Sequence, residues 1–399
     1  MKSAWILFAA MFCANMGHSV LAPVLPPLTR ELGLSALQGG LILTCSSIVW
    51  VVFCPWWGRR SDDLGRKRVI IIGLAGYGLG AVIFAVFAQG GLDGVIANAT
   101  LVWLLLVGSR MIVGGMYAAA APAAQAYIAD VSTGQQRTAA MGVVSASNGL
   151  GGMLGPALGA LVVSLGMSVV APIFMSSLMP LLGMLLVWRL LPAIRSPLKQ
   201  GERAPKLNVL DGRLLPLMII GFCAMLVPAV VTFTLGYLVQ DRFGLDAIET
   251  ASQTGLAVTV SGAALFFAQI VLVQVLRLPP LKLLRLGMPL VLGSVLLLVA
   301  VASPLQLMLS MVLMGVGVGM AFPAFRSAVT FAVEPHEQGA VAGLASAMPG
   351  YSYIVGPALG TALYGLAPFL PFLLTSVIIV AGIGVLFLHP RTRAVQPAI

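Results

Sequence analysis

The chain has 399 residues, of which 59% are hydrophobic and 9% are charged, and this balance excludes a soluble protein of that length. The net charge of +10 could suggest nucleic-acid binding, but eighteen of the 22 Lys and Arg residues fall in segments on one side of the expected membrane topology. We therefore expect a multi-pass inner-membrane protein in a lipid bilayer, without a nucleic-acid partner and with both termini cytoplasmic. After Lys2 the apolar run continues through Pro23 without a cleavage site, so the first span is retained.

A membrane span needs about 20 apolar residues. The longest polar stretch, 192–213, predicts a cytoplasmic linker between an N-terminal six-helix bundle at 1–191 and a C-terminal one at 214–399. Two six-span halves are typical of alternating-access transporters. The twelve predicted spans are 4–26, 37–57, 69–88, 98–121, 139–163, 168–191, 214–239, 250–276, 284–302, 305–331, 339–364 and 368–388.

The first span carries Asn15 and His18, one helical turn apart on one face and near the middle of the membrane. Polar residues there are costly unless they line a cavity or pack internally. Two interpretations stay open, a cavity role and a hydrogen bond between helices. Other spans also carry polar residues, including Gln125 and Asn148. Each of these could either make a packing hydrogen bond or line the transport pathway.

A charged hairpin, 58–68, separates the second and third spans. Its density of charge places it at the membrane surface, and we expect Gly58 and Gly65 to permit a tight turn. Asp62 is expected either to face a helix N-terminus or to pair with arginines. The alternative is that the hairpin is only a positively charged anchor.

Arg110 lies within the fourth span and Arg326 within the tenth. A buried arginine needs a partner, an aqueous cavity or an anionic ligand. At an offset of 201 residues Arg326 corresponds to Gln125, near the cytoplasmic end of its span, so snorkelling to the interface is an alternative for it. All twelve acidic residues fall in loops or at span ends, which leaves His18 as the one mid-span residue of a type whose unperturbed pKa is near neutral.

The segment 155–159, Gly-Pro-Ala-Leu-Gly, returns unchanged at 356–360, again an offset of 201 residues. The same offset relates Gly114 to Gly315 and Pro122 to Pro323. Two homologous halves explain this shared register, and we expect the same helix to break at the same place in each. General enrichment of Gly and Pro in membrane helices is the alternative.

The four cysteines lie in apolar spans without metal-like spacing, so we expect no disulfide, no metal and no cofactor. Clustered carboxylates, metal-spaced His or Cys and Gly-rich nucleotide loops are absent from the sequence, which disfavours an enzyme.

These residues together resemble the major facilitator superfamily, and within it the twelve-span drug:proton antiporters that include the tetracycline pumps. The resemblance implies an all-α membrane protein of the major facilitator fold, with 12 transmembrane helices in two pseudo-symmetric bundles, acting as a monomer. It rests on the hairpin motif, the fourth span and the antiporter motif of the fifth span. Their matching residues are Gly58, Asp62, Gly65, Arg66 and Lys67, then Arg110 and Gly114, then Gly142, Gly151, Gly155, Pro156 and Gly159.

In the family the hairpin latches the two halves, and the fifth-span motif is associated with exporters. The resemblance therefore implies gating roles for Gly58, Asp62, Gly65, Arg66, Lys67, Gly155, Pro156 and Gly159. It also implies a part in proton transfer for Arg110. The hairpin departs from the usual pattern at Arg60 and Asp63.

Tetracycline-type pumps carry an acidic residue in the first span, and around the matching position this chain reads Cys13-Ala14-Asn15, without a carboxylate. The deep ionisable groups are then His18, Arg110 and Arg326, and a neutral-to-positive cavity favours a polar or anionic metabolite, such as a siderophore. We predict proton-coupled export of this small molecule by alternating access. Asn15, His18, Arg110, Gln125 and Arg326 are the candidate binding residues, and His18 and Arg110 the candidate proton-coupling residues. A multidrug or tetracycline pump is the alternative, and the fifth-span motif argues against an importer.

Overall fold

The computed structural model describes residues 1–132, 134–194, 211–275, 278–334 and 337–389. Most of the predicted linker, 195–210, lies outside this range. Within it, all regular structure is helical, which confirms the all-α prediction. Eleven stretches are long and apolar enough to cross a membrane, and they include every predicted span except 339–364. There, α12 still forms a helix of 29 residues.

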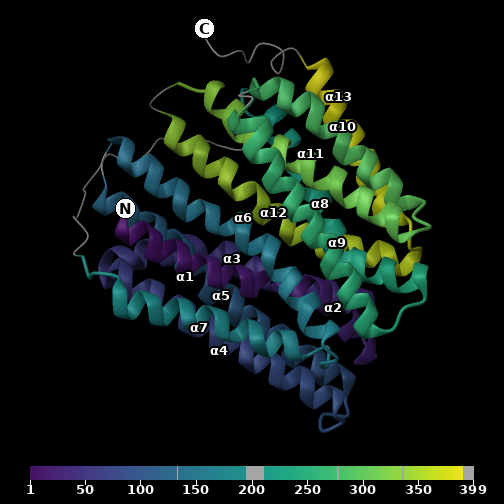
Figure 1. The fold of residues 1–399 in the computed structure, drawn as a ribbon. Helices are drawn as coiled ribbons and strands as arrows, with labels where there is room; N and C mark the ends of the chain where they lie inside the picture. Colours follow the sequence, from purple (N-terminus) through teal and green to yellow (C-terminus); the bar gives the residue numbers. More distant parts are fainter. Residues whose placement is uncertain (133, 195–210, 276–277, 335–336, 390–399) are drawn as a thin grey trace. The chain divides into compact units, whose positions relative to one another are not determined.

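Two compact units divide the chain. The first comprises residues 1–200 together with 235–259, which run from the last turns of α8 into α9, and the second comprises 201–234 and 260–399. The division of the halves at 192–213 stays a prediction. The helices of the first half of the chain are α1 (Lys2–Ser19), α2 (Leu21–Glu31), α3 (Ala36–Leu64), α4 (Arg66–Leu92), α5 (Ala99–Val131), α6 (Gly134–Ser164) and α7 (Ala171–Leu190) (Figure 1).

The second half of the chain repeats this series of long helices. A seven-residue π-helix, Gln269–Val275, continues α9 within the predicted span 250–276. The helices are α8 (Leu215–Phe243), α9 (Ala247–Ala268), α10 (Pro280–Val299), α11 (Pro304–Phe331), α12 (Gln338–Leu366) and α13 (Leu370–Leu388).

Small residues hold the helices of each unit together. In the first unit, α4 and α5 lie side by side (Figure 1), and a Cβ on Gly73 of α4 would come within 2.9 Å of the Ala119 side chain of α5. Lipid is as apolar as a leucine side chain, so close backbone contact rather than hydrophobicity drives this packing.

The sequence repeat corresponds to repeated packing. A Cβ on Gly155 of α6 would overlap Met16 and Ser19 of α1, and a Cβ on its counterpart Gly356 of α12 would come within 2.7 Å of the Ala229 side chain of α8. Gly155 and Gly356 therefore have equivalent roles. Each lets its helix pack closely against the first helix of its own half, as pseudo-symmetry requires.

Three details of the sequence prediction were wrong. Both α6 and α12 run through the repeated Gly-Pro step without a break, because the proline is accommodated within the helix. The first span extends to Glu31 with Pro26 and Pro27 inside α2. Gly58 lies within α3, so the hairpin turn rests on Gly65 alone, whose φ of 90° favours glycine.

Candidate functional site

Asn15 joins three helices of the first unit. Its Oδ1 accepts a hydrogen bond from the Tyr117 hydroxyl of α5, and its Nδ2 donates to Oδ1 of Asn148 in α6 at 2.7 Å and to the Met11 carbonyl at 2.8 Å. Both amide protons are therefore used, which fixes the orientation of the Asn15 side chain. The Asn148 side chain is exposed and accepts through its oxygen, so its own NH₂ is available for other acceptors.

His18 and Asn15 share Tyr117 as a neighbour. The His18 and Tyr117 rings are stacked, with centroids 5.3 Å apart and planes at 15°, and the Tyr77 ring lies 5.4 Å from Tyr117 at 60°. His18 is exposed, whereas Tyr77 is buried and its hydroxyl donates to the Ala14 carbonyl at 3.4 Å. Asn15 thus makes hydrogen bonds between helices, one of the two interpretations of the first-span pair, and the cavity role stays a prediction.

Arg110 is buried within the first unit. It is 6% exposed, its Nε has no hydrogen-bond partner, and none of the ion pairs found between described residues includes it. Gly17, Tyr77 and Ser176 are among the residues that line a small cavity beside it. Its backbone carbonyl accepts from Ser46 of α3 at 2.8 Å. A charge held in such surroundings is costly, and an anion would offset the cost.

The glycines of the fifth-span motif keep α6 against α1. A Cβ on Gly151 would lie 2.6 Å from the Asn15 Cβ, and one on Gly155 would overlap Met16, whereas one on Gly159 would meet Val20 at an ordinary 3.4 Å. This close approach is what brings Asn148 within hydrogen-bonding distance of Asn15.

The hairpin residues form a separate cluster. Arg66, with 10% of its side chain exposed, pairs with Asp62 and also donates from Nε to Asp130 at the end of α5, at 3.1 Å. Asp62 therefore pairs with an arginine, one of the two alternatives expected from the sequence. Lys67 donates to the Trp188 carbonyl at 2.9 Å.

Gln125 and Arg326 are the other two candidate binding residues from the sequence. Gln125 is exposed on α5. Arg326 belongs to the second unit, where it is exposed, donates to Ser346 at 3.3 Å and lies over the Phe322 ring at 5.8 Å.

Comparison with known proteins decides the family. The family model for the Major Facilitator Superfamily matches residues 7–348 and, in a second match, residues 217–398. The chain belongs to the major facilitator superfamily. It is thus a multi-span membrane transporter, and the predicted fold of two pseudo-symmetric bundles is confirmed.

Curated relatives and solved structures agree with this assignment. Multidrug resistance protein 2 of Bacillus subtilis (strain 168) is 26% identical over 95% of this chain and 93% of that protein. The class G tetracycline resistance protein of Vibrio anguillarum is 30% identical over 91% of this chain and 90% of that one. The bacillibactin exporter of B. subtilis (strain 168) is 31% identical over 41% of this chain and 39% of that exporter. The crystal structure of a mutant of the nucleoside transporter NupG has a TM-score of 0.74 at 13% identity, covers 98% of both chains, and shows the fold alone.

Two tyrosines of the transporter were missed by sequence reasoning. Tyr117 lies seven residues after Arg110, two helical turns along the same face of α5, and this spacing could have linked them. Tyr77 carried no such signal, since its place beside Tyr117 depends on how α4 packs on α5.

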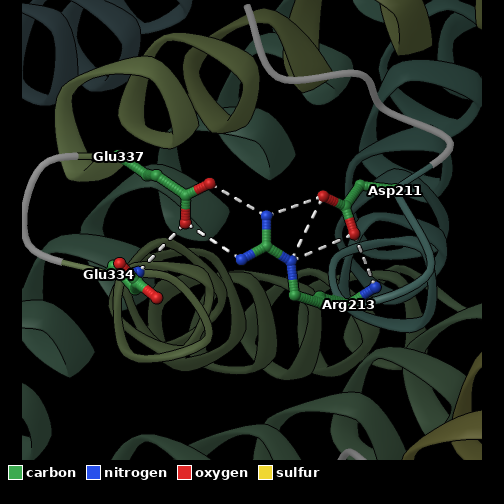
Figure 2. A network of polar contacts seen from close by, with 4 residues as sticks. All are labelled: Asp211, Arg213, Glu334 and Glu337. Atoms are coloured by element: carbon green, nitrogen blue, oxygen red, sulfur yellow. Dashed lines mark hydrogen bonds and ion pairs between the residues drawn. The ribbon is translucent and has the colours of Figure 1, made fainter. Parts of the chain in front are cut away.

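A charged network, also unpredicted, lies in the second unit of the transporter (Figure 2). Arg213, just before α8, donates to Asp211 at 2.9 Å and to both carboxylate oxygens of Glu337 at 2.9 and 3.0 Å. Glu337 also accepts from the backbone N–H of Glu334 at 3.1 Å. The hydrogen bonds with Asp211, and then those with Glu337, raise the pKa of Arg213. This network ties the end of the predicted linker to the segment between α11 and α12.

Proposed function

We propose that this transporter exports a polar or anionic metabolite, such as a siderophore, from the cytoplasm across the inner membrane by alternating access driven by proton entry. Coupling, direction and substrate are the proposed parts. The relative named for bacillibactin export supports a metabolite, although it is similar over less than half of either chain.

The observation that carries the proposal is the buried guanidinium of Arg110. Its Nε has no partner and it has no carboxylate neighbour among the ion pairs of the described residues, so it creates a positive potential inside the first unit. An anionic group of a substrate would neutralise this charge in surroundings where water is scarce and the attraction is strong. A cationic drug would add to the unfavourable charge.

We assign the remaining roles in the same proposal. Arg110 holds the anionic group and Asn148 donates to it, while the accessible His18 takes up and releases the coupling proton. Asn15 orients Tyr117 and Asn148. Gln125 and Arg326 bind the substrate in other stages of the cycle, and the Arg66 cluster with Asp62 acts as the gate.

A multidrug or tetracycline-type pump is the second candidate. It is favoured by the resistance proteins among the relatives, since both of those described above match more than nine-tenths of this chain. Under this reading the aromatic faces of Tyr77, Tyr117 and His18 would contact a flat drug.

Untargeted mass spectrometry of culture supernatants tests the two candidates. We would compare wild-type cells, a deletion strain, and the deletion strain carrying either the intact gene or Arg110→Met, with and without iron limitation. We expect one anionic metabolite to leave the supernatant and accumulate inside the deletion strain, with rescue by the intact gene but not by Arg110→Met. Identical supernatants, together with resistance to lipophilic cations on overexpression, would favour the drug pump instead.

A further inference from the structure

An ion pair joins the end of α2 to the end of α8. Arg30 donates from Nη1 to Oδ1 of Asp241 at 2.6 Å and from Nη2 to Oδ2 at 2.8 Å, and its Nη1 also donates to Gln240 at 3.0 Å. The two residues are 211 positions apart in sequence, yet both belong to the first compact unit. In the predicted division of the chain, Arg30 is in the N-terminal half and Asp241 in the C-terminal half.

A buried layer lies beneath this ion pair. The hydroxyl groups of Tyr237 and Thr29 are 2.7 Å apart, and the Arg30 guanidinium lies over the Tyr237 ring at 5.3 Å. Thr29 is fully buried and Tyr237 is 2% exposed, whereas the side chains of Arg30 and Asp241 are 32% and 37% exposed. The ion pair therefore covers a sealed contact.

Glycines permit the close approach of the two helices. A Cβ on Gly236 of α8 would lie 2.7 Å from the Pro26 ring of α2, and a Cβ on Gly39 of α3 would overlap the Tyr237 hydroxyl. A methyl group at either glycine would have to displace the Pro26 ring or the Tyr237 hydroxyl, so the fit depends on these small residues.

The contact lies at the side of the membrane opposite the Gly58–Arg68 hairpin, because successive spans alternate in direction and Arg30 precedes the second span. The ion pair is about one-third exposed to water, which screens its charges, so it adds little stability to the contact. An ion pair of this kind can therefore form and break repeatedly.

We propose that Arg30, Tyr237 and Asp241 form a latch that closes one end of the transport path and opens during each cycle. The proposal rests on the alternating-access part of the proposed function. In the closed state the bidentate pair and the Tyr237–Thr29 bond hold α8 against α2. Opening breaks both and exposes Thr29.

The test measures access to Thr29 in the full-length protein in lipid nanodiscs, without any substrate. Thr29→Cys is placed in a background in which Cys13, Cys45 and Cys54 are alanine, while the buried Cys223 is kept as a reporter of unfolding. A water-soluble maleimide is the probe, and mass spectrometry follows each thiol. We expect the introduced thiol to react slowly but to completion while Cys223 stays unmodified.

Adding Asp241→Asn should raise the rate of modification by about two- to fivefold, because one charge of the pair is lost. The matched control is Asp93→Asn, which removes an exposed carboxylate that accepts from Gln89 at 2.8 Å on the same side of the membrane, and it should leave the rate unchanged. Arg30→Asp combined with Asp241→Arg should return the rate towards its original value. If Asp241→Asn lets Cys223 react, Arg30→Gln replaces it.

The latch is overturned if the introduced thiol never reacts, or if neither Asp241→Asn nor Arg30→Gln changes its rate in folded protein. Because the assay contains no substrate, these outcomes do not depend on which molecule is exported. A faster rate in the variants together with unchanged culture supernatants would retain the latch and reject the proposed substrate.

Discussion

The side-chain amide of Asn15 donates to Oδ1 of Asn148 at 2.7 Å and so joins α1 to α6 across 133 positions of sequence. The same amide accepts from Tyr117 of α5. One residue of the first span thereby sets the relative positions of a stacked aromatic pair and an exposed amide.

Asn15→Leu should lower the free energy of unfolding by about 1–3 kcal/mol, because the Tyr117 hydroxyl loses its acceptor within the helix bundle. Thermal denaturation in detergent measures the effect. The double variant with Tyr117→Phe should cost less than the sum of the two single variants, since it removes both ends of the bond. Strictly additive effects would show that the bond contributes nothing.

Arg110→Met should be at least as stable as the wild type, because it removes a buried charge that has no counter-charge among the described ion pairs. Export of an anionic metabolite should nevertheless fall at least about tenfold, a loss of about 1.4 kcal/mol of binding. Arg326→Met, which removes an exposed arginine, serves as the comparison. It should change the free energy of unfolding less than Arg110→Met does. A marked loss of stability in Arg110→Met would point to an unseen partner of the guanidinium.

Gly155→Ala should destabilise the transporter by about 1–3 kcal/mol, because the added methyl group would overlap Met16 and Ser19 and push α6 away from α1. Gly152→Ala on the same helix is the matched control. A Cβ there meets nothing within 4 Å, so this change should be neutral or stabilising by about 0.5–1 kcal/mol. Equal melting temperatures for the two variants would contradict the packing.

Gly65→Ala should cost about 1–3 kcal/mol, because alanine is strained at a φ of 90°. Gly58→Ala should be tolerated, since Gly58 lies inside α3 and has open space around its Cα. Thermal denaturation distinguishes the two hairpin glycines. If Gly58→Ala were the more damaging change, the turn would lie elsewhere in the membrane-bound protein.

Arg213→Gln should lower the melting temperature slightly, and by the same amount at pH 7 and pH 9. The pKa of Arg213 is higher in the folded protein than in the unfolded chain. The stabilisation is therefore complete at any pH below the unfolded-state pKa of arginine, and it is lost only as the pH rises through the still higher folded-state pKa. The difference should shrink in about 1 M salt, because the Arg213 side chain is 44% exposed and its pairs are screened. A difference that grew between pH 7 and pH 9 would show that another group titrates in the network.

Much of the fold could be predicted from the sequence. The number of apolar runs that are long enough to cross the hydrocarbon layer predicts the number of membrane helices, because a helix satisfies all of its backbone groups within the segment. The repeat of 155–159 at 356–360 indicated two related halves, and Gly155 and Gly356 do pack in equivalent places. The supposed break at Pro156 was wrong, since a proline in a membrane helix is compatible with a continuous helix.

The site could be predicted only in part. Helical spacing placed Asn15 and His18 on one face, and the cost of a buried charge drew attention to Arg110. Helical spacing says which residues share a face, but it does not say which helix that face meets. The stacking of Tyr117 on His18 and the pairing of Arg30 with Asp241 were therefore decided by tertiary packing alone, because both depend on contacts between helices that lie far apart in the sequence.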